Sequence, residues 1–132
     1  MKNEATLPFD VTETSPGCLL VDMDASESDW TQPFLLRSDS HHDNAHADHR
    51  LETIHLDEAV GRGAGILDAG DLFCAMQGKY DRRADLSQCR PEHQNGRYLD
   101  SLVETASEYY EPFAKNWVLM AHGNHETSIL KH

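Results

Sequence analysis

Three short apolar runs, each followed at once by polar residues, constrain the fold of this chain most strongly. The runs occupy residues 33–36 (PFLL), 65–70 (GILDAG) and 117–121 (WVLMA), and their apolar residues are continuous and do not alternate with polar ones. Continuous short runs are typical of strands that are covered on both faces, as in parallel sheets. Segments with helical periodicity separate the runs. The sequence therefore predicts an α/β fold with a mixed, largely parallel sheet and flanking helices.

Two segments between these runs have the spacing of helices. In residues 45–65, Leu51, Ile54, Ala59 and Val60 mark the face that we expect to be buried, and Gly61 marks the end of the helix. The second helix is predicted from a set of apolar residues at i, i+3 and i+4 spacing: Leu99, Leu102, Val103, Ala106, Tyr110 and Phe113. We expect it to end near Pro112, because proline lacks the amide hydrogen that a helix interior needs.

The chain divides into an acidic arm, 1–33, and an α/β part, 34–132. The arm has seven acidic residues and one basic residue. We predict a single strand in it, 18–23, after the turn residues Pro16 and Gly17, with the first dozen residues mobile or loosely docked.

Charge and composition argue against two classes of protein, those that wrap nucleic acid and those that span a membrane. The net charge of -12 argues against an extended basic surface that wraps nucleic acid. Residues 79–97 differ, with five basic residues against three acidic ones, and are a candidate anion-contact loop or, alternatively, a solvated surface loop. No apolar run approaches the roughly 18 residues of a membrane helix. We expect a cytoplasmic protein with no membrane partner and with reduced cysteines.

Metal-competent side chains follow each predicted strand. Asp39 and His41 follow the first run, Asp71 follows the second, and Asn124 and His125 follow the third. Ligands of open α/β sheets bind beyond the carboxyl ends of the strands, so these side chains are expected to meet. Carboxylate, imidazole and amide groups together suit borderline divalent metals.

The three segments, DSH (39–41), GD (70–71) and GNHE (123–126), resemble the opening motifs of the calcineurin-like metallophosphoesterases, in the family's order. The resemblance covers residues 34–132 and is nearest to phosphoesterases common in bacteriophages and bacteria. The family's fold is a four-layer αββα sandwich, of which this stretch is similar to the amino-terminal half. GDLFCAM has Cys74 where many relatives have an acid or a histidine, which argues against the phosphoprotein phosphatases and the break-repair nucleases.

The resemblance implies a role for each motif residue. Asp39 and His41 bind one metal ion, Asp71 bridges two, and Asn124 binds the second. His125 lies beside the scissile phosphate, with a carboxylate orienting its ring, and donates to the leaving oxygen. The implied cofactors are two divalent ions, manganese first, with iron, zinc, nickel or magnesium as alternatives. The implied reaction is hydrolysis of phosphate esters, especially phosphodiesters, by a metal-bridging hydroxide in a bacterial or phage-infected cell.

The basic segment 79–97 supplies candidate substrate contacts for this reaction. We expect four basic residues to contact a phosphate ester such as a nucleic acid: Lys79, Arg82, Arg83 and Arg90.

Family members add two further motif blocks, a lone histidine and then G-H-x-H, after the three found here. We therefore expect one sheet face to be exposed and covered by self-association or by a companion chain that supplies the remaining ligands. The alternative function is a non-catalytic half that binds a partner chain.

A separate histidine cluster offers one more candidate. His42, His46 and His49 lie at i, i+4 and i+7 and would form a one-face zinc site if the helix began before them. The alternative is a polar cap on the helix.

Overall fold

The computed structural model describes residues 7–25, 27–77 and 81–129. Within them, strands and helices follow in the order β1 Phe9–Ser15, β2 Cys18–Met23, β3 Phe34–Arg37, α1 His49–Gly61, β4 Gly65–Asp68, α2 Tyr98–Tyr110, β5 Trp117–Met120 and α3 Asn124–Ile129. Three 3-10 helices, Leu86–Gln88, Pro91–His93 and Glu111–Asn116, lie on either side of α2.

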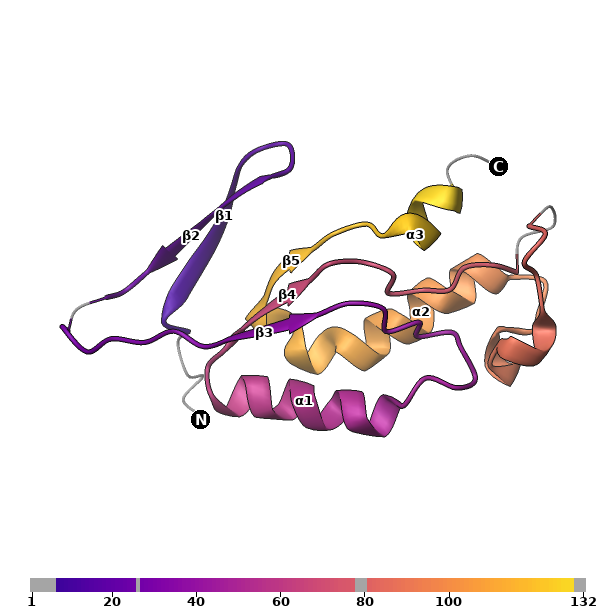
Figure 1. Ribbon diagram of the computed structural model, residues 1–132, viewed down its shortest axis with the longest axis horizontal. Helices are drawn as coiled ribbons and strands as arrows, with labels where there is room; N and C mark the ends of the chain where they lie inside the picture. The colour runs from indigo at the N-terminus through magenta and orange to yellow at the C-terminus, as the bar shows by residue number, and fades with distance from the viewer. Residues whose placement is uncertain (1–6, 26, 78–80, 130–132) are drawn as a thin grey trace.

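The central feature is a parallel sheet with the strand order β3-β4-β5, and it confirms the predicted α/β class. All three apolar runs form its strands. Parallel neighbours need a crossover connection, and α1 and α2 lie in the two crossovers. The three strands therefore point the same way, and their carboxyl ends meet at the end of the sheet opposite the β1–β2 hairpin (Figure 1).

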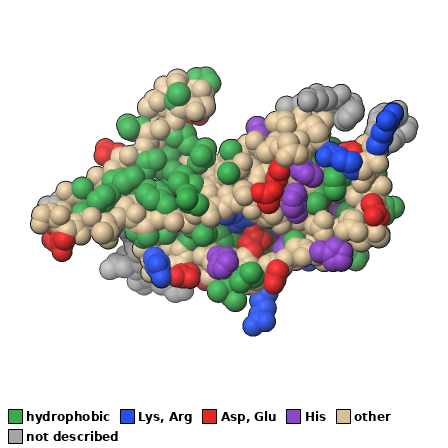
Figure 2. Space-filling model, viewed as in Figure 1, with side chains coloured by type: hydrophobic (Ala, Val, Ile, Leu, Met, Phe, Trp, Pro, Cys, Tyr) green, Lys and Arg blue, Asp and Glu red, His purple; other side chains and the backbone are tan. Residues whose placement is uncertain are grey.

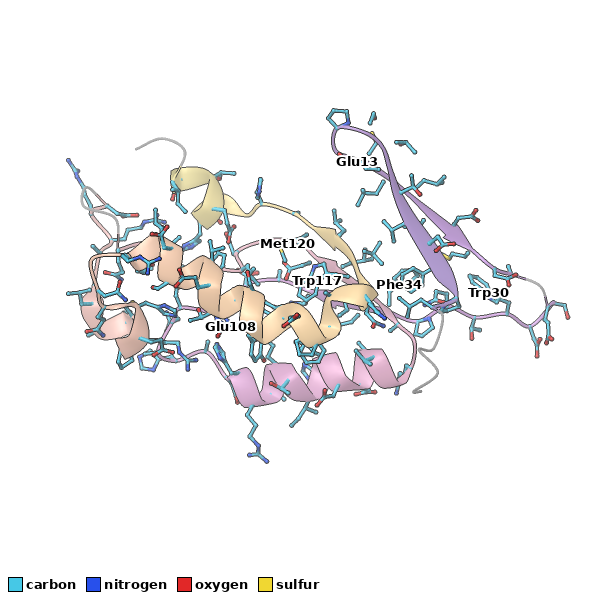
Figure 3. The ribbon with its side chains drawn as sticks, turned by 180° about the vertical axis from the view of Figure 1, so that it is seen from behind. Glu13, Trp30, Phe34, Glu108, Trp117 and Met120 are labelled. Atoms are coloured by element: carbon cyan, nitrogen blue, oxygen red, sulfur yellow. The ribbon has the colours of Figure 1, made fainter. Side chains whose placement is uncertain are left out.

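Helices α1 and α2 cover one face of the sheet, as seen from behind in Figure 3. The core between them contains Leu56 of α1, Ile66 of β4 and Ala106 of α2. Tyr110 and Phe113 also belong to this core, and Trp117 packs against it. Burial of these side chains holds the strands in place and so fixes where the loops after the strands begin.

The buried face of α1 differs from the prediction. Leu56 and Ala59 are buried, but Leu51 and Ile54 are about half exposed. The reason is Glu52, which lies on the same stripe as Leu56 and Ala59 and turns toward the sheet to pair with Arg37. An ion pair at an inward position thus sets the helix rotation, which apolar spacing alone does not reveal.

The second helix agrees better with its prediction. Leu102, Ala106 and Tyr110 are buried, and the α-helix ends at Tyr110, two residues before Pro112. Of the predicted face, Leu99 and Val103 are exposed.

The acidic arm contains a hairpin, whereas we predicted a single strand. β2 is the predicted strand, and β1 pairs antiparallel with it through contacts such as Val11 opposite Val21. Gly17 has φ 74°, which a tight turn requires and glycine adopts without steric cost. Phe9 is buried and lies 6.4 Å from Phe34 between ring centroids, so the hairpin is docked on β3. The prediction for residues 1–6 lies outside the described residues.

The other face of the parallel sheet is exposed and apolar. The register aligns Leu36, Leu67 and Leu119 in one row across the three strands, with Leu36 74% exposed and Leu119 40% exposed. Figure 2 shows hydrophobic side chains gathered over this sheet and the hairpin, with histidine and acidic side chains beside them where the strands end. This exposed face agrees with the expectation that one sheet face lacks a cover, and it differs from the two covered faces that the continuous apolar runs indicate. Among the helices described, none has the length and apolar character needed to cross a membrane.

Candidate functional site

The loops after β3 and β4 run side by side beyond the ends of their strands. The Asp39 amide donates to the Gly70 carbonyl at 3.0 Å, and the His41 amide donates to the Asp71 carbonyl at 3.2 Å. Two sequence segments about thirty residues apart are thus joined by backbone hydrogen bonds. The structure brings the DSH and GD motifs together, as the sequence predicts.

Three of the predicted metal ligands have left-handed backbone conformations. Asp39 has φ 55°, His41 has φ 46° and Asp71 has φ 55°. Asp and His are among the residue types that tolerate this region best, and it still costs free energy that the surrounding contacts must offset. The motif residues therefore adopt uncommon conformations that turn the chain sharply at the strand ends.

Two glycines allow the loop after β5 to join this pair. A side-chain carbon at Gly70 would lie 2.3 Å from the Gly123 nitrogen, and one at Gly123 would lie 2.0 Å from Asp71 Oδ1. Neither position has room for any side chain. The GNHE segment can therefore pack directly on the GD segment.

Glu126 fastens these two segments to each other. Its Oε2 accepts hydrogen bonds from the amides of Gly123, at 2.8 Å, and Asp71, at 3.1 Å. Its Oε1 accepts from the Phe73 amide at 2.9 Å. Sequence analysis gave Glu126 no role of its own. Glu126 lies three residues after Gly123, which directly precedes α3. A glutamate at this spacing often accepts the free backbone amide at a helix start, and this is the signal that could have suggested its role.

His125 is held from two sides. Its amide donates to Asp71 Oδ1 at 2.8 Å, and its ring Nδ1 lies 2.7 Å from the Cys74 carbonyl oxygen. The expected carboxylate partner of the ring is thus wrong, and a backbone carbonyl takes that place. Because a carbonyl only accepts, Nδ1 carries the proton and Nε2 is the ring atom left to exchange one. The ring centroid lies 5.0 Å from that of His41.

The four predicted metal ligands lie at one end of the sheet but differ in exposure. Asp71 is buried, the side chain of Asp39 is 64% exposed, and Asn124 is exposed at the start of α3. His41 Nε2 and Asp39 Oδ1 are 4.0 Å apart. Two ligands of one tetrahedral ion with bonds of about 2.1 Å lie about 3.4 Å apart, so these two atoms must approach each other by about half an ångström to share an ion in that geometry.

The four candidate metal ligands, all of them described residues, do not form a complete coordination site. Buried His41 Nδ1 has no hydrogen-bond partner among the described residues. In the same parts of the chain, no group of three or more His, Cys, Asp and Glu side chains is arranged to hold a metal ion. The donor types suit a divalent metal, whereas the described His, Cys, Asp and Glu side chains do not surround one point.

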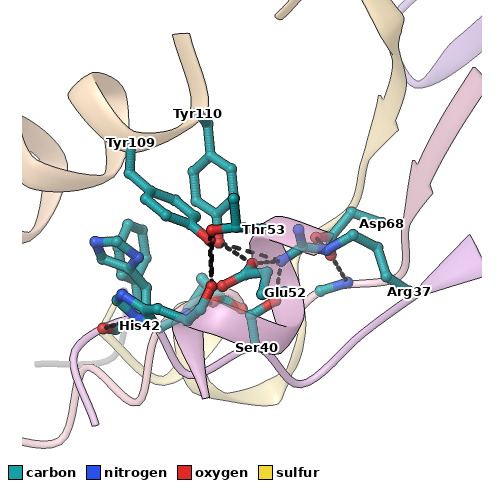
Figure 4. A network of polar contacts seen from close by, with 12 residues as sticks. Arg37, Ser40, His42, Glu52, Thr53, Asp68, Tyr109 and Tyr110 are labelled. Atoms are coloured by element: carbon teal, nitrogen blue, oxygen red, sulfur yellow. Dashed lines mark hydrogen bonds and ion pairs between the residues drawn. The ribbon is translucent and has the colours of Figure 1, made fainter. Parts of the chain in front are cut away.

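A buried ion-pair network supports the strand ends below the site (Figure 4). Arg37 Nε lies 2.9 Å from Asp68 Oδ2, and a terminal nitrogen of Arg37 lies 2.6 Å from Glu52 Oε1. The Tyr110 hydroxyl contacts both Arg37 and Glu52. Burial opposes the charge of Arg37, but Tyr110 and the two carboxylates outweigh it and raise its pKa. Asp68 Oδ1 accepts the Gly70 amide at 2.8 Å, which connects this network to the GD loop.

The basic segment lies beside α3, and its charges are partly paired. Arg83 forms an ion pair with Asp81 at 2.8 Å and donates to Ser128 of α3 at 3.2 Å. Arg90 pairs with Glu92 at 2.7 Å. Arg82 is exposed. Lys79, the remaining substrate candidate, lies outside the described residues.

The proposed one-face zinc site of His42, His46 and His49 does not form. Helix α1 begins only at His49, so His42 and His46 are not on it. The rings of His42 and His49 stack with centroids 4.7 Å apart, and stacked rings do not direct their nitrogens at one ion. Burial, followed by the neighbouring His49, lowers the pKa of His42 to about 4. His42 is therefore a neutral core side chain at physiological pH.

The two cysteines near the site are free, buried thiols. Burial raises the pKa of Cys74, and it raises that of Cys89 to about 11. They act as apolar side chains here, as the composition led us to expect.

Comparison with protein-family models, with curated proteins and with solved structures finds no match for this chain. The motifs and the geometry described above are the observations that bear on its function.

Proposed function

We propose that this protein is a metal-dependent phosphoesterase that hydrolyses phosphate esters, with phosphodiesters as the preferred class. The observation that carries the proposal is the meeting of three motif segments at the carboxyl ends of β3, β4 and β5. They are connected by direct contacts, from Asp39 and His41 to the GD loop and from Asp71 to His125. Loops at this position are where α/β sheets place their ligands.

Asp39, His41, Asp71 and Asn124 are the residues proposed to hold two divalent ions, manganese first. Asp71 Oδ1 already holds the His125 amide, so a cation at Asp71 and the position of His125 are coupled. When bound, the ions supply positive charge for the phosphoryl oxygens and make a water more acidic. The chain's own carboxylates, imidazole and amide provide the site, and the carboxylates of Asp39 and Asp71 supply its negative charge.

His125 is the proposed catalytic residue. Its Nδ1–H donates to the Cys74 carbonyl, so Nε2 is the atom that takes up a proton, which makes the ring an imidazolium, and then passes that proton to the leaving oxygen. A fixed ring needs no reorientation before it donates, which is the benefit of holding a catalytic group in place.

A phosphodiester fits the surroundings of the site. The contact between Arg83 and Ser128 brings the basic segment to the same helix that begins with Asn124. Arg82 is exposed next to this contact, and among the described basic residues of segment 79–97 it is the one that could reach a phosphate without first leaving an ion pair shown here. A second phosphate or a nucleic-acid backbone would find positive charge there, on an otherwise acidic protein.

The proposal is tested by the hydrolysis of bis-p-nitrophenyl phosphate with added Mn²⁺. We expect wild-type protein to release p-nitrophenol and the His125→Ala variant to lose about 100-fold or more of the rate, as expected for a general acid. The matched control is His122→Ala, because His122 is an exposed histidine three residues earlier. Equal rates for wild type and His125→Ala would contradict the proposal.

A second candidate function is the binding of a partner chain through the sheet. It is favoured by the row of Leu36, Leu67 and Leu119, in which Leu36 and Leu119 are exposed and Leu67 is partly buried, because such an apolar row resembles an interface more than a solvated surface. A companion chain or a second copy placed there would also lie beside the candidate metal ligands. A metal titration with fewer than two tightly bound ions and no turnover would favour this candidate, whereas two ions with turnover would favour the enzyme.

A further inference from the structure

A chain of hydrogen bonds runs from the first residue of α2 to the ring of His125. The Tyr98 hydroxyl donates to Asp43 Oδ2 at 2.6 Å. Asp43 in turn accepts the amides of Cys74, at 2.6 Å, and Ala75, at 3.2 Å. The Cys74 carbonyl accepts from His125 Nδ1 at 2.7 Å. No sequence motif named above contains Asp43 or Tyr98.

We infer that Asp43 and Tyr98 are positioning residues that hold the His125 ring in its Nδ1–H tautomer and in its orientation, through the turn at Cys74 and Ala75. The inference rests on the proposed function, because it is the catalytic use of His125 that gives the ring's orientation a consequence.

The turn between Asp43 and His125 needs such support. Ala75 has φ 50°, a left-handed conformation that alanine rarely adopts. A residue of this kind keeps such a conformation only when its surroundings fix it. The Asp43 carboxylate does so by accepting two consecutive amides of the turn. The Cys74 carbonyl is thereby aimed at the His125 ring.

The Asp43 carboxylate is itself well placed for this task. It is 1% exposed, and its two oxygens accept three hydrogen bonds, two from the turn and one from Tyr98. Burial and the bond to Asp43 raise the pKa of Tyr98, so its hydroxyl remains a donor across the accessible pH range. Loss of that donor leaves a buried carboxylate with two partners in place of three and frees it to move.

The test compares Tyr98→Phe with Tyr109→Phe. Both variants remove one hydroxyl from a partly buried tyrosine of α2. Tyr109 bonds to Thr53 and to the His49 carbonyl, which belong to α1 and not to the Cys74 turn. Each variant therefore loses the hydrogen bonds of one α2 hydroxyl, but only the bond lost in Tyr98→Phe is connected to His125. Asp43→Asn, which keeps the size of the buried side chain, is a second variant expected to behave like Tyr98→Phe.

Two measurements are made on the full chain. The first is the long-range ¹H–¹⁵N spectrum of metal-free protein at a pH where the His125 ring is neutral, which reports its tautomer. The second is Mn²⁺-supported hydrolysis of bis-p-nitrophenyl phosphate. We expect a mixture of tautomers and a fall in kcat of about tenfold at unchanged KM for Tyr98→Phe, with neither change for Tyr109→Phe.

The outcomes separate this inference from the proposed function. Wild-type protein without turnover contradicts the proposed function, and the tautomer comparison still decides whether Tyr98 orients the ring. The inference is overturned if the His125 signals of Tyr98→Phe match those of Tyr109→Phe, or if the loss of activity lies in KM alone. Loss of the folded state in Tyr98→Phe, judged by circular dichroism, would show a structural role and also overturn it.

Discussion

Replacing Gly123 by alanine tests whether the close packing of the GD and GNHE loops forms the site. The added carbon would lie 2.0 Å from Asp71 Oδ1, 2.4 Å from the Asp71 nitrogen and 2.5 Å from its Cγ. Ordinary contacts of such a carbon begin near 3.4 Å. The loops must therefore separate by about 1 Å or more, since neither the backbone nor the carboxylate can yield in place.

The size of the effect follows from that displacement. Inserting a methyl group into a packed region costs about 1–3 kcal/mol of unfolding free energy. The same movement stretches the 2.8 Å bond between Asp71 Oδ1 and the His125 amide. A misplacement of about 1 Å lowers enzymatic rates by about 100-fold. Gly123→Ala is therefore expected to lose far more activity than stability.

The assay combines urea unfolding with Mn²⁺-supported hydrolysis of bis-p-nitrophenyl phosphate. The control is Gly96→Ala, because a side-chain carbon at Gly96 meets nothing within 4 Å. We expect the control to match wild type in both measurements. Wild-type stability together with a wild-type rate in Gly123→Ala would show that the two loops are not packed as described.

Three further predictions concern stability and association. Arg37→Met leaves the buried Asp68 carboxylate unpaired and should lower the free energy of unfolding in urea by about 3–5 kcal/mol. Arg62→Met removes an exposed ion pair and should lower it by less than about 0.5 kcal/mol. Equal losses in the two variants would contradict the buried network. The pKa of His42 is lowered to about 4 in the folded protein. Between pH 6.5 and pH 4 the unfolded chain therefore binds a proton at this ring and the folded protein does not. Stability is then fully present above pH 6.5 and falls by about 3 kcal/mol toward pH 4, a loss that thermal melts of His42→Phe should not show. Leu36→Glu, at a side chain 74% exposed, should leave unfolding unchanged and reduce association in sedimentation velocity, and unchanged association would exclude this face.

The strands and their order along the chain could be predicted because both depend on local pattern. Continuous apolar runs mark β3, β4 and β5, and helical periods between them imply parallel crossovers. β1 was missed because it has few apolar residues of its own, Phe9 and Val11 among them. Its strand conformation depends on pairing with β2, which is a non-local contact.

The face of α1 shows a different limit of the sequence pattern. Leu51 and Ile54 have the spacing of a buried stripe, but the pairing of Glu52 with Arg37 turns the helix away from it. The inward position of Glu52 can be inferred only when its ion-pair partner on β3, Arg37, is known. Apolar periodicity locates a helix well but does not fix its rotation when buried ion pairs compete.

The candidate site was predicted by residue type but not by contact. The motifs identified Asp39, His41, Asp71, Asn124 and His125, and the contacts between their loops agree with that grouping. The partner of the His125 ring is a backbone carbonyl, which no side-chain pattern can indicate. For the same reason the support from Asp43 could not be seen, since it acts through amides of a turn about thirty residues away.

Binding of Mn²⁺ to wild type and to Asp71→Asn, measured by isothermal titration calorimetry, tests whether a metal centre lies at the ends of β3, β4 and β5. Asparagine tolerates the left-handed φ of 55° at this position and can still accept the His125 amide, so the substitution removes charge with little change of shape. We predict that wild type binds Mn²⁺ and that Asp71→Asn binds it at least about tenfold more weakly, as loss of a charged ligand requires. Equal affinity in the two proteins would contradict a metal centre at the ends of these strands.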